Sequence, residues 1–194
     1  MDNLMKQSNK FRGKYRVEST RLRHWDYSSN GTYFITLCTK NRESFLGEIV
    51  DGEMQLSEIG KIVQKYWLEI PDHFSFIMLN NFIIMPNHMH GIVVIDKAHD
   101  VETRQCLVST AATKTINRFQ NQGKHTISSI IGAYKSICTK TINKTQNKIF
   151  FGWQPRFYDH IIRDKNNLIR TREYIINNPI KWDSDKNNPE NIYM

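Results

Sequence analysis

The run from Met85 to Ile95, Met-Pro-Asn-His-Met-His-Gly-Ile-Val-Val-Ile, limits the possible folds more than any other part of the chain. Its apolar, β-branched second half is typical of a buried strand. Residues two apart in a strand point to the same face, so we expect His88 and His90 to lie side by side. Such a pair can share one metal ion, or it can be a pair of hydrogen-bonded, partly buried histidines. The spacing alone leaves both interpretations open.

A segment near the end of the chain can add a third ligand. Asp164 is suited to cap a helix that begins at about Lys165, and Pro179 is suited to end it. Helical spacing predicts that the buried stripe of this helix consists of four aliphatic residues, Leu168, Ile169, Ile175 and Ile176. Tyr174 and Asn178 are one turn apart and lie away from that stripe. Since a tyrosine used for packing belongs on the apolar face, Tyr174 is a candidate for chemistry.

The charge of the chain indicates an anionic partner. Lys and Arg number 27 against 19 Asp and Glu, which gives a formal net charge of +8. This excess favours nucleic acid over a membrane surface, because no long amphipathic basic helix is present; a merely solvated basic surface is the alternative.

The cysteines and the apolar runs indicate a compartment. The three cysteines are far apart and form no Cys-x-x-Cys pair, which argues against a disulfide framework or zinc ribbon and favours a reducing cytoplasm; they are Cys38, Cys106 and Cys138. No run approaches the ~18 apolar residues that span a bilayer, and the N-terminus lacks an apolar signal core. We therefore expect a cytoplasmic protein with no membrane contact.

The order of predicted elements indicates one α+β domain. It is strand, helix, strand, strand, helix, strand, helix, with a hairpin inserted around Asp51-Gly52. The ranges are a strand at 31–39, hairpin strands at 45–49 and 53–56, a helix at 58–69 ended by Pro71, one or two strands across 74–85, the His-x-His strand, a helix at 126–144, a strand within 150–163, and the helix that carries Tyr174. This order is consistent with a ferredoxin-like or RRM-like sandwich.

Composition divides the chain further. Residues 1–28 form a basic arm in which aromatic residues alternate with Lys and Arg, either as a contact for single-stranded nucleic acid or as a partly ordered tail. Residues 29–182 form the single domain, with a flexible insertion at 97–124, and residues 183–194 form a C-terminal tail.

The helix at 126–144 carries a second tyrosine. Tyr134 lies on the apolar stripe of this helix, so it is expected to be a core residue and not a nucleophile. Three lysines lie off the stripe and could face a phosphate backbone or simply be solvated, namely Lys135, Lys140 and Lys144.

Three ordered motifs together resemble a known family. They are Met-Pro-Asn-His-Met-His-Gly at 85–91, Trp-Gln-Pro-Arg-Phe-Tyr-Asp-His-Ile-Ile-Arg at 153–163, and Tyr-Ile-Ile-Asn-Asn-Pro at 174–179. The sequence resembles the single-tyrosine HUH transposases and is most similar to the REP-associated tyrosine transposases. The resemblance implies a central antiparallel sheet that carries a metal-binding pair, His88 and His90. It further implies that Tyr174 bonds to the 5′ end of a cleaved single strand and that Asn178 fills an amide ligand position, where the insertion-sequence branch has the longer glutamine.

These residue types suit phosphodiester chemistry. Three neutral ligands leave a divalent ion its full charge, which can stabilise charge developing on a phosphate; Mn²⁺ fits this donor set better, and Mg²⁺ is the commoner ion. A tyrosine with an ordinary pKa near 10 needs help to attack at neutral pH, and His160 or Lys135 could assist. Arg156 and Arg163 are candidate DNA contacts, or they hold their loop by hydrogen bonds to carbonyls.

The resulting expectation is a single-stranded DNA endonuclease and strand-transferase that cleaves next to a DNA hairpin. Two alternatives remain, a catalytically lapsed hairpin-binding regulator of the same fold and a metal hydrolase that uses water. The sequence also leaves open whether the protein acts as a monomer or as a homodimer.

Overall fold

The structure is a computed structural model that describes residues 22, 25–98, 125–145, 150–185 and 187–188. Most of the basic arm at 1–28, nearly all of the insertion at 97–124 and the end of the C-terminal tail lie outside the described residues. The expectations for those segments therefore stay predictions.

A four-stranded antiparallel sheet organises the described part of the chain. Its strands are β1 (Gly31–Cys38), β4 (Ile77–Met85), β5 (His88–Ile95) and β6 (Tyr158–Ile162), in the order β4-β5-β1-β6. With α1 (Glu58–Leu68) and α3 (Ile127–Thr145), these strands follow the β-α-β-β-α-β order of ferredoxin-like folds. The expected α+β class, with the His-x-His strand in the central sheet, is confirmed.

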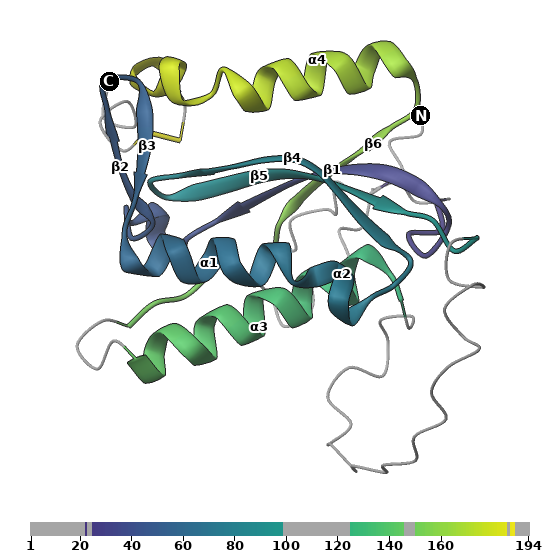
Figure 1. The fold of residues 1–194 in the computed structure, drawn as a ribbon, viewed down its shortest axis with the longest axis horizontal. Helices are drawn as coiled ribbons and strands as arrows, with labels where there is room; N and C mark the ends of the chain where they lie inside the picture. The colour runs from purple at the N-terminus through teal and green to yellow at the C-terminus, as the bar shows by residue number, and fades with distance from the viewer. Residues whose placement is uncertain (1–21, 23–24, 99–124, 146–149, 186, 189–194) are drawn as a thin grey trace, which may run out of the picture.

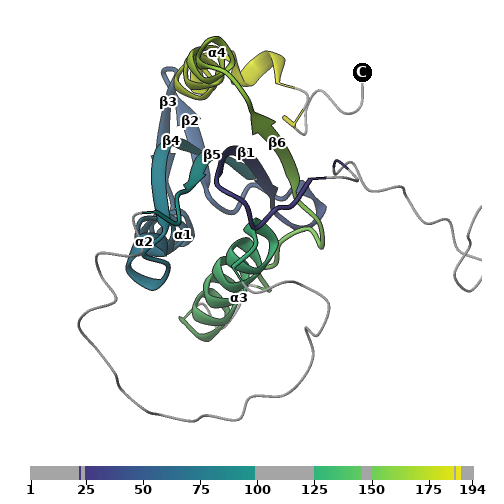
Figure 2. The same ribbon diagram turned by 90° about the vertical axis from the view of Figure 1, so that its right-hand side faces the viewer.

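The helices divide between the two faces of the sheet. In Figure 1, α1 and α3 lie below the sheet and α4 (Lys165–Ile176) lies above it; Figure 2 gives the same arrangement after a quarter turn. The main core lies between the sheet and the lower helices, where Tyr33, Ile35 and Leu37 of β1 meet buried residues of α1 and α3. A smaller apolar cluster, Ile92, Ile162 and Ile175, holds α4 against the opposite face. Because β5 is covered on both faces, its second half is almost continuously apolar.

The glycine after the histidine pair is required by close packing. Gly91 points toward the lower helices, and a Cβ added there would overlap the indole ring of Trp67 on α1. The buried indole thus occupies the space that any larger side chain on β5 would need.

The remaining elements agree with the expected order, with three corrections. The hairpin consists of β2 (Gly47–Val50) and β3 (Glu53–Leu56), and its turn residues Asp51 and Gly52 both have positive φ. The helix expected at 58–69 ends at Leu68. Pro71 does not follow α1 as a helix stop. It lies in the first turn of a second, short helix, α2 (Ile70–His73), where the missing N–H has no partner to lose. The strand expected from residue 74 begins at Ile77 and is one strand with an irregularity between Leu79 and Phe82.

Two short 3₁₀ helices complete the described elements, η2 (Lys40–Arg42) and η4 (Pro179–Ser184). No helix in the described ranges has both the length and the apolar character needed to span a bilayer.

Candidate active site

The two histidines of β5 lie side by side, as expected, on the sheet face that α4 covers. Their Nε2 atoms are 3.1 Å apart, and both side chains are buried, with 0% of His88 and 2% of His90 exposed. Each ring is held by a hydrogen bond at its other nitrogen, Nδ1.

The neighbouring residue Asn87 determines which nitrogen of His88 carries the proton. The Nδ2 atom of Asn87 donates to the main-chain carbonyls of Arg42 and Asn187, at 3.1 and 2.7 Å. Its Oδ1 therefore faces His88 Nδ1, 2.9 Å away, and must accept a hydrogen bond from it. The Nε2 atom of His88 is left with its lone pair, as a metal ligand requires.

Burial also keeps His88 neutral. Loss of hydration, with a smaller contribution from the positive charge of Arg42, lowers the pKa of His88 from 6.5 to about 3. At neutral pH this imidazole is therefore a ready donor of a nitrogen lone pair.

The second histidine is fixed by β1. Thr36 pairs with His90 across the sheet, and its Oγ1 lies 2.8 Å from His90 Nδ1. The ring of Phe34 stacks on the His90 imidazole with centroids 5.3 Å apart and planes 25° apart. These contacts set the orientation of the ring and aim Nε2 toward α4.

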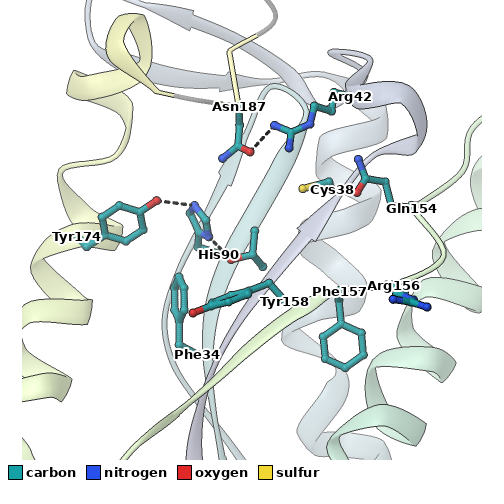
Figure 3. Close-up of a pocket in the computed structure, with 11 residues that line it drawn as sticks. Phe34, Cys38, Arg42, His90, Gln154, Arg156, Phe157, Tyr158, Tyr174 and Asn187 are labelled. Carbon is teal, nitrogen blue, oxygen red and sulfur yellow. Dashed lines mark hydrogen bonds between the residues drawn. The ribbon is translucent and has the colours of Figure 1, made fainter. Parts of the chain in front are cut away.

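Helix α4 brings Tyr174 to this pair. The Tyr174 hydroxyl lies 3.2 Å from His90 Nε2, and 42% of the surface of the residue is exposed. Figure 3 marks this contact with a dashed line. Asp164 caps the helix as expected, since its side chain accepts a hydrogen bond from the main-chain N–H of Asn167. The hydroxyl of a partly exposed tyrosine thus contacts one member of a buried histidine pair.

The expected buried stripe of α4 was wrong. Ile175 is buried, but Ile169 and Ile176 are 41% and 60% exposed. The helix packs through Ile175 and the partly buried Leu168, so its buried face is rotated toward Tyr174 and away from the other two isoleucines. This rotation places Tyr174 at the edge of the buried face, where it can reach His90.

Asn178 follows the end of α4 and is almost completely buried, with 2% of its surface exposed. Its Oδ1 atom has no hydrogen-bond partner among the described residues. A buried amide oxygen without a partner is costly unless something absent from the protein chain binds it. The sequence placed Asn178 away from the buried stripe expected for α4, and the structure instead buries it directly after Asn177, the C-terminal cap of the helix.

These donors fit a divalent metal ion. The two Nε2 atoms, 3.1 Å apart, can both lie about 2.1 Å from one ion. The described residues contain no cluster of three His, Cys, Asp or Glu that could hold a metal. The amide oxygen of Asn178, which has no hydrogen-bond partner among them, is of the kind that binds hard divalent ions.

The surroundings of Tyr174 disfavour its ionised form in the metal-free protein. Burial raises the pKa of Tyr174 above its ordinary value, and the negative charge of Asp185 adds to this; hydrogen bonding from the side chain of Asn178 opposes it. A cation near the hydroxyl would act in the opposite direction.

A cavity of about 570 Å³ opens beside the Tyr174 hydroxyl (Figure 3). It is bounded by β1, β6, α4 and the segment that precedes β6. Its lining combines aromatic rings with amide and guanidinium groups: Phe34, Thr36, Cys38, Arg42, His90, Gln154, Arg156, Phe157, Tyr158, Tyr174 and Asn187.

Comparison with known sequences gives a relative of almost the same length. An uncharacterized protein of Haemophilus influenzae (strain ATCC 51907 / DSM 11121 / KW20 / Rd) is 39% identical over 175 residues, which cover 90% of this chain and 94% of the relative. The chain belongs to the family of this Haemophilus protein. No protein-family model matches the sequence.

Comparison with solved structures establishes the fold independently of close sequence similarity. A REP-associated tyrosine transposase, solved bound to a REP hairpin, matches with a TM-score of 0.52 and 21% identity over 84% of this chain and 74% of that one. This protein therefore has the fold of a REP-associated tyrosine transposase, as its three sequence motifs predicted.

The other predicted site residues are not all brought to the histidine pair. Lys135 donates from Nζ to the main-chain carbonyls of Gln154 and Pro155, and burial lowers its pKa. Arg156 lines the cavity beside Tyr174. Arg163 lines a second cavity of about 410 Å³ together with His160, which lies 3.3 Å from Asn167 through its Nε2.

These positions bear on the expected roles. Neither His160 nor Lys135 has a described contact with the Tyr174 hydroxyl, so assistance to the tyrosine by either one stays a prediction. The DNA contacts of Lys135, Arg156 and Arg163 also stay predictions.

Tyr134 lies in the core, as expected. Its hydroxyl donates to the main-chain carbonyl of Val63 at 3.0 Å and contacts Met89 Sδ at 3.2 Å. Complete burial raises its pKa well above 10. Its burial and its hydrogen bond to the main chain are those of a core residue.

Sequence reasoning missed three residues that support the site. Asn87 and Thr36 orient the two imidazoles, and Trp182 of η4 stacks on His88 with centroids 5.9 Å apart and planes 29° apart. Only Asn87, adjacent to the pair and part of a recognised motif, offered a signal. Thr36 and Trp182 reach the site through strand register and chain reversal, which no local pattern encodes.

Proposed function

We propose that this protein is a metal-assisted, single-tyrosine DNA endonuclease and strand-transferase that acts on a single strand next to a DNA hairpin. One observation carries the proposal: the Tyr174 hydroxyl, His90 Nε2 and His88 Nε2 form an unbroken series of contacts at 3.2 and 3.1 Å. The hairpin bound by the REP-associated transposase of the same fold supports the choice of DNA as substrate.

The proposed nucleophile is Tyr174. Its oxygen attacks the phosphorus of a phosphodiester, the bond from phosphorus to the 3′ oxygen breaks, and a 5′-phosphotyrosine ester forms. The phenolic proton is lost, and the departing 3′ oxygen takes up a proton. The ester retains the energy of the broken bond, so a 3′ hydroxyl can later displace the tyrosine and rejoin the strand.

His88, His90 and Asn178 would hold the divalent ion, Mn²⁺ or Mg²⁺. When bound, the ion supplies positive charge that polarises a phosphate oxygen. Asn87 and Thr36 keep the imidazoles in place, and the neutral ligands leave the charge of the ion undiminished. The unpartnered Oδ1 of Asn178 supports this assignment.

The charge of the protein supports a polyanionic substrate. The net charge is +8, and two arginines line the cavity beside Tyr174, Arg42 and Arg156. Arginine is suited to phosphate because its guanidinium can donate two hydrogen bonds at once.

The test is a denaturing-gel search for covalent protein–DNA adducts. It uses end-labelled, hairpin-containing single strands from the sequence that flanks the gene, with Mn²⁺ or with EDTA. We expect a Mn²⁺-dependent adduct with the wild type and with Tyr134→Phe, and none with Tyr174→Phe. Loss of the adduct in Tyr134→Phe alone would falsify the choice of nucleophile.

Two other outcomes would select an alternative function. Cleavage that survives Tyr174→Phe indicates a hydrolase that uses water. Tight hairpin binding with no adduct in Mn²⁺ or Mg²⁺ indicates the catalytically lapsed regulator.

A further inference from the structure

The cavity beside Tyr174 has the size and lining of a site for an unpaired nucleobase. Its volume, about 570 Å³, lies within the range of about 300–1,000 Å³ found for small-ligand pockets. In Figure 3 the rings of Phe34, Tyr158 and Tyr174 lie on one side and the polar groups of Gln154 and Arg42 on another, while Arg156 lies beside Phe157. Proteins bind unpaired bases with this combination, because every base has a face that stacks and an edge that forms hydrogen bonds.

Tyr158 is the ring that offers a face for stacking. Phe34 is already covered on one face, since it stacks on His90 at 5.3 Å. The rings of Tyr158 and Phe34 are nearly perpendicular, with centroids 6.4 Å apart and planes 71° apart, and 50% of the surface of Tyr158 is exposed. Strand register fixes Tyr158 opposite Thr36, on the sheet face of the histidine pair.

Gln154 is placed to distinguish one base from another. Its side-chain amide combines a donor and an acceptor, as the edges of bases do. Its backbone is held at both polar atoms: the N–H donates to the Cys38 carbonyl at 2.9 Å, and the carbonyl accepts from Lys135 Nζ. Because this backbone is already held, only the side chain of Gln154 has to be ordered when a base binds.

We propose that this cavity binds one unpaired DNA base next to the phosphate that Tyr174 attacks. Tyr158 is the stacking surface, Gln154 reads the edge of the base, and Lys135 is a positioning residue that holds the Gln154 loop. The inference rests on the proposed function, because it takes a DNA strand as the substrate of the same site.

The test separates base binding from catalysis. Binding is measured by fluorescence anisotropy in EDTA, in a Tyr174→Phe background that cannot form an adduct. The probes are a short oligothymidylate and an abasic strand of the same length, which share a backbone and differ only in bases. We expect the oligothymidylate to bind more tightly than the abasic strand. Tyr158→Ala should reduce this preference about 5- to 150-fold, and Tyr158→Phe should retain it.

Two further variants sharpen the test. Phe150→Ala removes a 78% exposed aromatic ring that does not line the cavity, and it should leave the preference unchanged. Gln154→Leu should still bind oligothymidylate more tightly than the abasic strand. The differences in affinity among oligomers of adenine, cytosine and thymine should become smaller. The inference is overturned if Tyr158→Ala leaves the preference for oligothymidylate unchanged. It is also overturned if the Tyr174→Phe protein, with no other substitution, binds both strands equally well.

Failure of this inference is distinguishable from failure of the proposed function. An adduct that depends on Tyr174, with no role for Tyr158 in binding, removes the base pocket and leaves the function. Binding that depends on Tyr158, with no adduct under any metal, supports the pocket and removes the catalytic proposal.

Discussion

Protonation of His88 should destabilise the metal-free protein as the pH falls. The folded pKa is about 3 and the ordinary value is 6.5, so between these values the unfolded chain binds a proton that the folded chain excludes. Folded-state stability that is present above pH 6.5 is therefore lost as the pH falls toward 3. From these two values, linkage gives a loss of about 2 kcal/mol between pH 7 and pH 5.

The assay is the free energy of unfolding by urea in EDTA at both pH values, for the wild type and for His88→Gln. Glutamine does not titrate, so the variant should lose about 2 kcal/mol less than the wild type over this interval. Comparing the two proteins cancels the contributions of all other titrating groups. His73→Gln, at an exposed position on α2, controls for the removal of an imidazole as such. Equal losses in the wild type and His88→Gln would refute the reasoning.

Three further predictions concern packing, the second tyrosine and the metal. Gly91→Ala would overlap Trp67 and should lower the free energy of unfolding by about 1–3 kcal/mol. Gly132→Ala, with nothing within 4 Å of the added carbon, should raise it by about 0.5–1 kcal/mol; urea titrations that rank the two variants the other way contradict the packing argument. Tyr134→Phe removes one buried hydrogen bond and should cost about 1 kcal/mol, yet leave adduct formation on the denaturing gel intact. Mn²⁺ at 100 times its Kd should stabilise the wild type by about 2.7 kcal/mol and His90→Ala far less; equal shifts in Tm for both, relative to EDTA, speak against the ligand assignment.

The fold was predictable because its signals are local. The β-branched run after His90, the Asp51-Gly52 turn, the Asp164 cap and the apolar stripe of the helix that carries Tyr134 each act within a few residues. Their order along the chain then leaves few arrangements that bury every apolar face. The position of Tyr134 in the core followed from the same stripe.

The helix that carries Tyr174 shows where local reasoning ended. Four aliphatic residues suggested a buried stripe, but the helix packs on a small cluster and leaves two of them exposed, Ile169 and Ile176. Which side of a helix is buried depends on the partner surface as well as on its own residues. The geometry of the site depends on that rotation, because Tyr174 reaches His90 only from the edge of the buried face.

Local patterns were enough to predict the class of the fold, the position of His88 and His90 on one face, and the candidate nucleophile. The first two follow from the two-residue and 3.6-residue periods of strands and helices, and the third is supported by the motif at 174–179. The packing of the folded chain was needed to show that Asn178 is buried with an unpartnered oxygen, that Asn87 and Thr36 orient the imidazoles, and that a cavity opens beside Tyr174. Apart from the contact between Asn87 and His88, these features join residues far apart in the chain. Their geometry follows from sheet register, helix rotation and chain reversal, and no short stretch of sequence encodes these.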